Sequence, residues 1–271
     1  MDNARFIDIG VNLTDKRFRD DLSETCQRAR DAGVCAMVIT GTSVNESESA
    51  LDLASKHTDL FATAGIHPHS ARHASQQALS EIRLIAQSEH VRAIGETGLD
   101  FNRDFSPRPD QERSFEAHLA LADELKKPVF LHQRDAHDRF MPILKAARDS
   151  LTDVVVHCFT GNQRELFDYL DLDCHIGITG WICDERRGQT LQELVHNIPA
   201  NRLMLETDSP WLLPRDVPGK NRFKGRNEPA LLPWIGSTVA RYRNEPPEPL
   251  LQQVLDTSMR FFAIEDDQLS S

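Results

Sequence analysis

Imidazole and carboxyl side chains occur within or directly after short apolar segments of this 271-residue chain. They are Asp8, His67, His69, Glu96, His132, His157 and Asp208. Imidazole nitrogens and carboxylate oxygens bind divalent cations, and the same groups can take up or release a proton. A single histidine in such a place is more often a hydrogen-bonded structural residue. Several costly polar groups at the ends of different strands favour one shared catalytic site instead.

Eight short apolar or β-branched segments have the composition of buried strands. These strands are expected at residues 6–11, 35–40, 60–66, 91–95, 129–132, 154–159, 175–179 and 203–207. Helices are expected at 45–57, 111–126, 164–170, 190–196, 231–243 and 249–262. This alternation, with no linker, predicts a fold of the α/β class: one (β/α)8 TIM-barrel domain over residues 1–271. A doubly wound open sheet is the alternative, but the chain has no glycine-rich phosphate turn after its first expected strand.

The carboxyl ends of barrel strands converge in space, so the polar residues that follow them would form a metal site at one end of the barrel. Each residue also has a structural explanation. Asp208 could cap a helix before Ser209, and Glu96 could brace a turn between Gly95 and Gly98. The conjunction of these groups favours the metal site.

Composition limits the classes of protein that the chain can belong to. It contains 31 Lys and Arg against 42 Asp and Glu, a net charge of −11, which argues against broad nucleic-acid binding through a basic surface. One local basic loop remains: Lys220, Arg222, Lys224 and Arg226. No apolar run approaches the length of a membrane span, and the five cysteines form no CxxC pair. We therefore expect a cytoplasmic protein.

Several motifs follow one another in the order found in a known family. Residues 128–138 (PVFLHQRDAHD) and 206–210 (ETDSP) match its two signatures. Further matches are GIHPH at 65–69, GETGLD at 95–100, HCFTG at 157–161 and RNEP at 226–229. Over nearly its whole length the chain resembles the TatD family of metal-dependent deoxyribonucleases. This resemblance implies a TIM barrel of the metal-dependent hydrolase superfamily and 3′-to-5′ exonuclease activity on single-stranded DNA, or also RNA, releasing 5′-mononucleotides.

The resemblance also implies roles for individual residues. Glu96, His132 and His157 would bind the metal, and Asp208 would be a further ligand and the base for the attacking water. Asp208 and Glu96 would then be the catalytic residues. His67 and His69 would lie near the scissile phosphate. In the basic loop Arg222 and Lys224 would bind the substrate, and Phe223 or Trp181 could stack a base.

The chain departs from most relatives at Gly10 and Asn12, where the family usually has two metal-binding histidines. Asparagine offers a neutral oxygen, which suits Mg²⁺ better than Zn²⁺. We therefore expect Mg²⁺, with Mn²⁺ or Zn²⁺ as alternatives, at one well-furnished site. A second, weak site would use Asp8, Glu96 and Asn12 and fill with substrate. The expected molecule is a monomer that binds single-stranded nucleic acid as substrate, without a membrane or a stable protein partner.

Two other functions fit the same pattern. A C–N or ester hydrolase could use this barrel, although many such relatives carry a metal-bridging lysine where this chain has Glu96. A non-catalytic quality-control factor for twin-arginine export is suggested only by the family name. Among the remaining residues, Cys158 is expected on a strand pointing away from the ligands. Cys183 is expected in a loop, where it could be exposed, and Glu228 is expected to pin the basic loop by pairing with an arginine.

Overall fold

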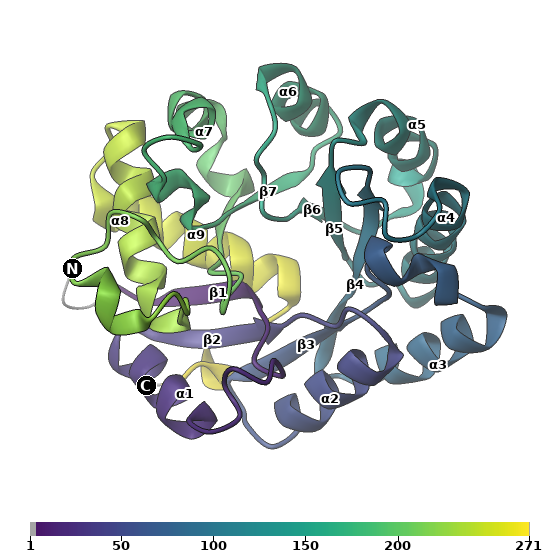
Figure 1. The fold of residues 1–271 in the computed structure, drawn as a ribbon, viewed down its shortest axis with the longest axis horizontal. Helices are drawn as coiled ribbons and strands as arrows, with labels where there is room; N and C mark the ends of the chain where they lie inside the picture. Colours follow the sequence, from purple (N-terminus) through teal and green to yellow (C-terminus); the bar gives the residue numbers. More distant parts are fainter. Residues whose placement is uncertain (1–3, 271) are drawn as a thin grey trace. The chain divides into compact units, whose positions relative to one another are not determined.

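A computed structural model describes residues 4–270 of the chain (Figure 1). Its strands are β1 (Phe6–Val11), β2 (Val34–Ile39), β3 (Leu60–Ala64), β4 (Val91–Asp100), β5 (Val129–Arg134), β6 (Val154–Val156), β7 (His175–Ile178) and β8 (Leu203–Leu205). Their order in the sheet follows the chain from β1 to β8, and the pairs β1–β2, β3–β4, β4–β5, β5–β6 and β7–β8 are parallel. Helices alternate with the strands, which confirms the predicted (β/α)8 class.

The helices include three that the sequence patterns did not predict. The predicted ones are α2 (Val44–Ala54), α4 (Arg108–Leu125), α6 (Gln163–Asp171), α7 (Gln189–Leu194), α8 (Leu232–Arg243) and α9 (Pro247–Phe262). The others are α1 (Leu22–Asp31), α3 (Gln76–Ala86) and α5 (His137–Ala147). Helix α1 buries only Thr25, Cys26 and Ala29, and α5 contains Pro142. The apolar stripe of α1 is therefore weak and that of α5 is interrupted, so neither stands out from the sequence.

Two strands that lead to candidate site residues, β4 and β6, end at other residues than the sequence predicted. Strand β4 continues five residues past Gly95, so Glu96 lies inside it. Strand β6 ends at Val156, and Cys158 has a left-handed φ of 47°. The expectation that strand alternation turns Cys158 away is therefore wrong, because Cys158 is not in a strand.

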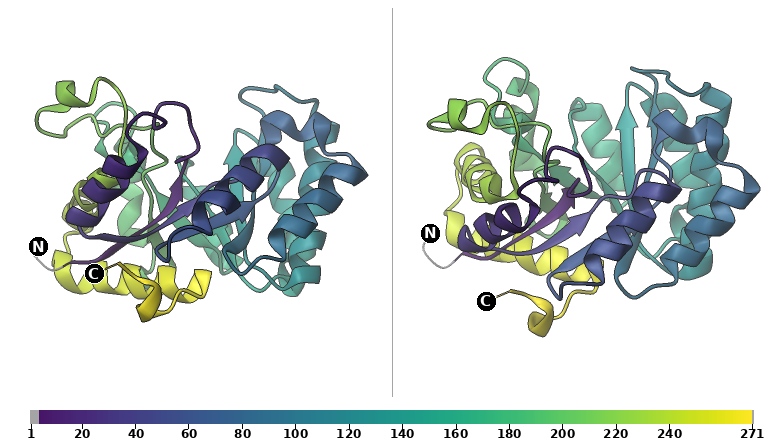
Figure 2. Two further views of the ribbon diagram at one scale, coloured as in Figure 1. Left: turned by 90° about the horizontal axis from the view of Figure 1, so that it is seen from below. Right: turned by 60° about the horizontal axis from the view of Figure 1, so that its bottom comes forward.

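The described residues divide into two compact units. The first unit comprises residues 4–39, 158–163 and 175–270, and holds β1, β2, β7 and β8. Within it, helix α9 contacts β1 and β8 (Figure 2), and the side chains of Ile9 and Phe262 are buried. The second unit comprises residues 40–157 and 164–174, and holds β3 to β6 with α2 to α5. The single domain expected from the sequence stays a prediction. Within residues 4–270 we find no helix long and apolar enough to cross a membrane.

Candidate metal centre

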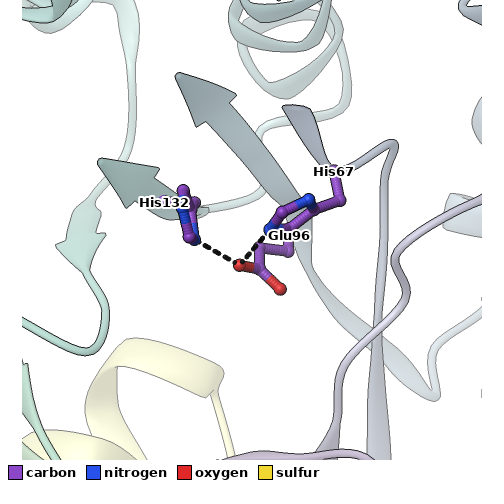
Figure 3. A group of neighbouring side chains, drawn as sticks. All are labelled: His67, Glu96 and His132. Atoms are coloured by element: carbon purple, nitrogen blue, oxygen red, sulfur yellow. Dashed lines mark hydrogen bonds and ion pairs between the residues drawn. The ribbon is translucent and has the colours of Figure 1, made fainter. Parts of the chain in front are cut away.

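Three imidazoles surround one carboxylate oxygen in the second unit. Glu96 Oε1 lies 2.8 Å from His132 Nδ1, 2.8 Å from His157 Nε2 and 3.2 Å from His67 Nε2. Figure 3 shows His67 and His132 approaching this oxygen from different sides. One ligand atom from each of His67, Glu96 and His132 lies within 4.8 Å of the others, an arrangement that could hold a metal ion. We call His67, Glu96, His132 and His157 the histidine–glutamate cluster.

Asp100, which the sequence analysis did not single out, completes the surroundings of His132. Its Oδ2 accepts a hydrogen bond from His69 Nε2 at 2.7 Å and lies 3.4 Å from His132 Nε2. Its Oδ1 accepts hydrogen bonds from the backbone N–H groups of Asn102 and Arg103. The only signal for Asp100 in the sequence was its place at the end of the GETGLD motif.

The charges at this site favour a bound cation. Burial of the Glu96 carboxyl group raises its pKa, but the neighbouring imidazoles outweigh burial and hold the pKa well below its ordinary value. For His132, burial lowers the pKa, yet the neighbouring carboxylates of Asp100 and Glu96 outweigh burial and leave the pKa raised. The two carboxylates therefore stabilise positive charge at this point.

His132 also carries an unsatisfied ligand atom. Its Nε2 is buried and makes no hydrogen bond within the described part of the chain, although Asp100 Oδ2 lies 3.4 Å away. Leaving such an atom unpaired is costly, and a divalent cation would satisfy it. The residues present therefore fit a metal ion.

His67 is held in a different chemical state. Its Nδ1 accepts a hydrogen bond from the backbone N–H of His69 at 3.1 Å. In the neutral ring the proton then sits on Nε2, which faces Glu96. In this state His67 is a hydrogen-bond donor rather than a metal ligand, and its expected place near a phosphate stays a prediction.

A close approach of two glycines brings His67 to Glu96. A Cβ atom on Gly65 would lie 2.5 Å from the carbonyl carbon of Gly95, so no larger residue fits where the chain leaves β3. The next residue, Ile66, donates its backbone N–H to Nε2 of His118 at 3.1 Å, and Nδ1 of His118 donates to the carbonyl of Ser114 at 2.7 Å. His118, on α4, therefore fixes the segment that carries His67. Sequence reasoning missed it, because a buried histidine on a helix has no signal of its own.

The pH dependence of stability tests this role of His118. Burial lowers the pKa of His118 from 6.5 to about 4, so below pH 6.5 the unfolded chain binds this proton more readily than the folded one. Its contribution to the free energy of unfolding is complete above pH 6.5 and is lost as the pH falls towards 4, by about 3 kcal/mol. Urea unfolding of the wild type and of His118→Gln, which keeps a hydrogen-bond acceptor, should show a steeper loss in the wild type between pH 7 and pH 4. An equal loss of unfolding free energy in the two proteins would contradict this role of His118.

The first unit holds Asp208 through the two positions that depart from the family pattern. Asp208 has a left-handed φ of 50°, and its backbone N–H donates to the carbonyl of Gly10 at 2.9 Å. Its Oδ1 accepts a hydrogen bond from Asn12 Nδ2 at 3.0 Å. Asn12 thus acts as a donor that orients Asp208. The expected role of Asp208 as ligand and base stays a prediction.

Asp8 is engaged within the same unit. Its carboxylate accepts hydrogen bonds from the backbone N–H of Thr207 at 2.9 Å and the hydroxyl of Thr207 at 2.5 Å. Complete burial outweighs these bonds and raises the pKa of Asp8 to about 8. These contacts give Asp8 a structural role in holding the segment before Asp208, and its role as a ligand stays a prediction.

The basic loop is anchored at its C-terminal end. Glu228 forms ion pairs of 2.8 Å with both Arg28 and Arg226, which confirms the expected pairing with an arginine. Arg226 also pairs with Asp21 at 2.7 Å. Arg222 and Lys224 are exposed. The loop therefore presents two cations from a fixed base.

The remaining candidates in the first unit have their own contacts. Trp181 donates its indole N–H to the carbonyl of Arg187, whose guanidinium lies 4.4 Å from the ring centroid. The guanidinium of Arg222 lies 4.7 Å from the ring centroid of Phe223. Base stacking by either ring stays a prediction. Cys183 is buried, and burial raises the pKa of its thiol to about 12, so the expectation that it could be exposed is wrong.

Comparisons with known proteins bear on this site. The family model described as TatD related DNase matches residues 7–263. The chain is 51% identical to the "3'-5' ssDNA/RNA exonuclease TatD" of Rahnella sp. (strain Y9602), covering 95% of this chain and 98% of the relative. It is 52% identical to the protein of the same name from Klebsiella pneumoniae (strain 342), covering 88% and 90%. The crystal structure of YJJV, a TatD homologue from Escherichia coli K12, superposes with a TM-score of 0.88 at 27% identity, covering 97% of this chain and 99% of that one. The chain belongs to the TatD-related DNase family.

Proposed function

We propose that this protein is a metal-dependent 3′-to-5′ exonuclease that acts on single-stranded DNA and RNA. The observation that carries the proposal is the buried histidine–glutamate cluster, in which Nε2 of His132 has no hydrogen-bond partner within residues 4–270. The names of relatives about 50% identical over most of the chain support the polarity and the substrate.

Glu96, His132 and His157 would hold a divalent cation, with Asp208 as a further ligand. Such a cation supplies Lewis-acid activation of water and neutralises charge on the phosphate. Imidazole nitrogens suit Zn²⁺, whereas carboxylate oxygens suit Mg²⁺ and Mn²⁺. We propose Mg²⁺ as the working ion, because Glu96 and Asp208 offer carboxylate oxygens. The expected second, weak site would involve Asp8, Glu96 and Asn12.

The side chains would divide the remaining work. Asp208, oriented by Asn12, would accept the proton of the attacking water. His67 would hold its Nε2 proton between Glu96 and a phosphate oxygen, since its Nδ1 is already an acceptor. His69, fixed by Asp100, would lie beside the same phosphate. We further propose that the protein works in the cytoplasm as a monomer.

Arg222 and Lys224 would bind the substrate backbone, and the salt dependence of binding tests this. Removing one cation that contacts a phosphate of single-stranded nucleic acid should reduce the slope of log affinity against log salt by about 0.7. We expect that reduction for Arg222→Ala and for Lys224→Ala, measured by fluorescence anisotropy with a labelled oligonucleotide. Lys145→Ala, which removes a cation from helix α5, is the matched control and should leave the slope unchanged. Unchanged slopes for both loop variants would show that the loop does not bind the strand.

The proposed activity is tested by digesting a 5′-labelled single-stranded DNA oligonucleotide with Mg²⁺, Mn²⁺, Zn²⁺ or EDTA. A ladder that shortens from the 3′ end only with a metal ion supports the proposal. His132→Ala should abolish the ladder, which excludes a contaminating nuclease. His196→Ala, which removes an exposed histidine from the short helix Val195–Asn197, should leave it unchanged. If the protein digests the oligonucleotide with none of the three metal ions, the proposal is overturned.

A further inference from the structure

An exposed aromatic ring lies beside the histidines of the metal centre. Phe105 follows β4, and 54% of its surface is exposed. Its ring packs edge-on against His69, with the ring centroids 4.7 Å apart. His69 in turn contacts His67, at 4.2 Å between centroids. The ring of Phe105 is therefore one side chain removed from the histidine–glutamate cluster.

The exposure of Phe105 does not come from a loose loop. The next residue, Ser106, is fully buried; its hydroxyl donates to the carbonyl of His69 at 2.8 Å and accepts from the backbone N–H of Arg72 at 3.0 Å. Buried Gln111 donates to the carbonyls of Ser106 and Asp100. These bonds fix the backbone next to Phe105, and the ring itself packs against His69.

Asp104, on the other side of Phe105, is held as well. Its carboxylate accepts hydrogen bonds from Arg108, the first residue of α4, at 3.0 Å from Nε and 2.7 Å from Nη2. Both neighbours of the ring are thus fixed. A rigid aromatic ring loses little conformational entropy when a flat ligand packs on it.

The chemistry of the ring indicates the ligand. One exposed ring is too small for a protein-docking surface, which needs a contiguous patch of several hundred Å². A phenyl ring offers no charge to a phosphate, but every nucleobase can stack on it. The position beside His69 places such a base next to the reacting phosphate of the proposed function.

We propose that Phe105 is a stacking platform for a nucleobase that flanks the scissile phosphate. The proposal rests on the proposed exonuclease function. Stacking is insensitive to base identity, so it would hold the end of any single strand while each successive nucleotide is removed. Phe105 would thereby position the substrate without acting on the reacting atoms.

A cycle between protein and substrate variants tests this. The substrates are one DNA oligonucleotide with natural bases, and two in which an abasic nucleotide replaces either the terminal or the penultimate nucleotide at the 3′ end. For the wild type, removing the stacked base should lower kcat/KM about tenfold. Phe105→Ala should lose about tenfold on the natural strand and almost nothing more on that abasic strand. Phe105→Trp should retain the wild-type values.

The controls separate the possible failures. Phe167→Ala removes another exposed ring, on α6, and should behave as wild type. Phe105→Leu keeps apolar bulk without an aromatic face, and should show most of the loss seen with alanine. If Phe105→Ala lowers kcat/KM by the same factor on the natural strand and on both abasic strands, the ring does not stack on either base and the proposal is overturned. Full activity of Phe105→Ala on the natural strand would overturn it as well. A wild-type protein that cleaves no strand would overturn the exonuclease function itself, and the stacking role with it.

Discussion

Replacing Glu96 with glutamine is expected to slow oligonucleotide hydrolysis by at least about 100-fold. Glutamine keeps the shape of the side chain but removes the charge on the oxygen that three imidazoles face, at 2.8, 2.8 and 3.2 Å. Without that charge the cluster should lose affinity for a cation, because the neutral amide oxygen is a weaker ligand than the carboxylate. Rates should be measured at increasing metal concentrations, because weakened binding predicts partial recovery at high metal.

Glu112→Gln is the matched control for this variant. Glu112 pairs with Arg139 at 2.6 Å on the outer helices of the same unit. Arg139 is well exposed, so losing this pair should change the free energy of unfolding by no more than about 1 kcal/mol and leave activity unchanged. A Glu96→Gln protein that is as active as wild type at every metal concentration would remove Glu96 from the catalytic site.

Replacing Asp208 with asparagine is expected to lower kcat by about 10²- to 10⁴-fold while the fold is retained. Asparagine tolerates the left-handed backbone that Asp208 adopts at φ 50°, so the segment should keep its conformation. The variant lacks the carboxylate that would accept the proton of water. Single-turnover hydrolysis measures the chemical step, and thermal unfolding checks the fold.

Asp173→Asn is the control for the backbone effect. Asp173 also has a left-handed φ, of 57°, and lies on the surface before β7. It should behave as wild type in both measurements. If Asp208→Asn turns over at the wild-type rate, Asp208 is neither base nor essential ligand, and its bond to Asn12 is purely structural.

Sequence patterns predicted the strands well because buried parallel strands form continuous apolar runs. Strand β4 shows the limit. Its second half, Glu96 to Asp100, contains two carboxylates, a threonine and Gly98, and so lacks the composition of a strand. It is a strand because residues 97 to 100 pair with β5, from Thr97 opposite Leu131 to Asp100 opposite Arg134. Such pairing depends on contacts distant in sequence, which local composition does not reveal.

The site was predictable to the extent that its residues belong to motifs. The resemblance named Glu96, His132 and His157, and the structure brings these three together. Asp100, Gln111 and His118 were missed, since their role is to hold backbone and side chains that only the folded chain brings near. The function of Asn12 was also hidden, because a donor to Asp208 cannot be distinguished from a metal ligand by residue type.

The measurement that tests the central claim most directly is a titration with Mn²⁺, followed by the electron paramagnetic resonance signal of the free ion. The wild type should bind at least one Mn²⁺ with an affinity that matches the metal dependence of its hydrolysis. His132→Ala should bind that ion at least about tenfold more weakly, since it removes the buried Nε2 that lacks a hydrogen-bond partner in residues 4–270. Equal binding by the two proteins would contradict a metal centre at the histidine–glutamate cluster.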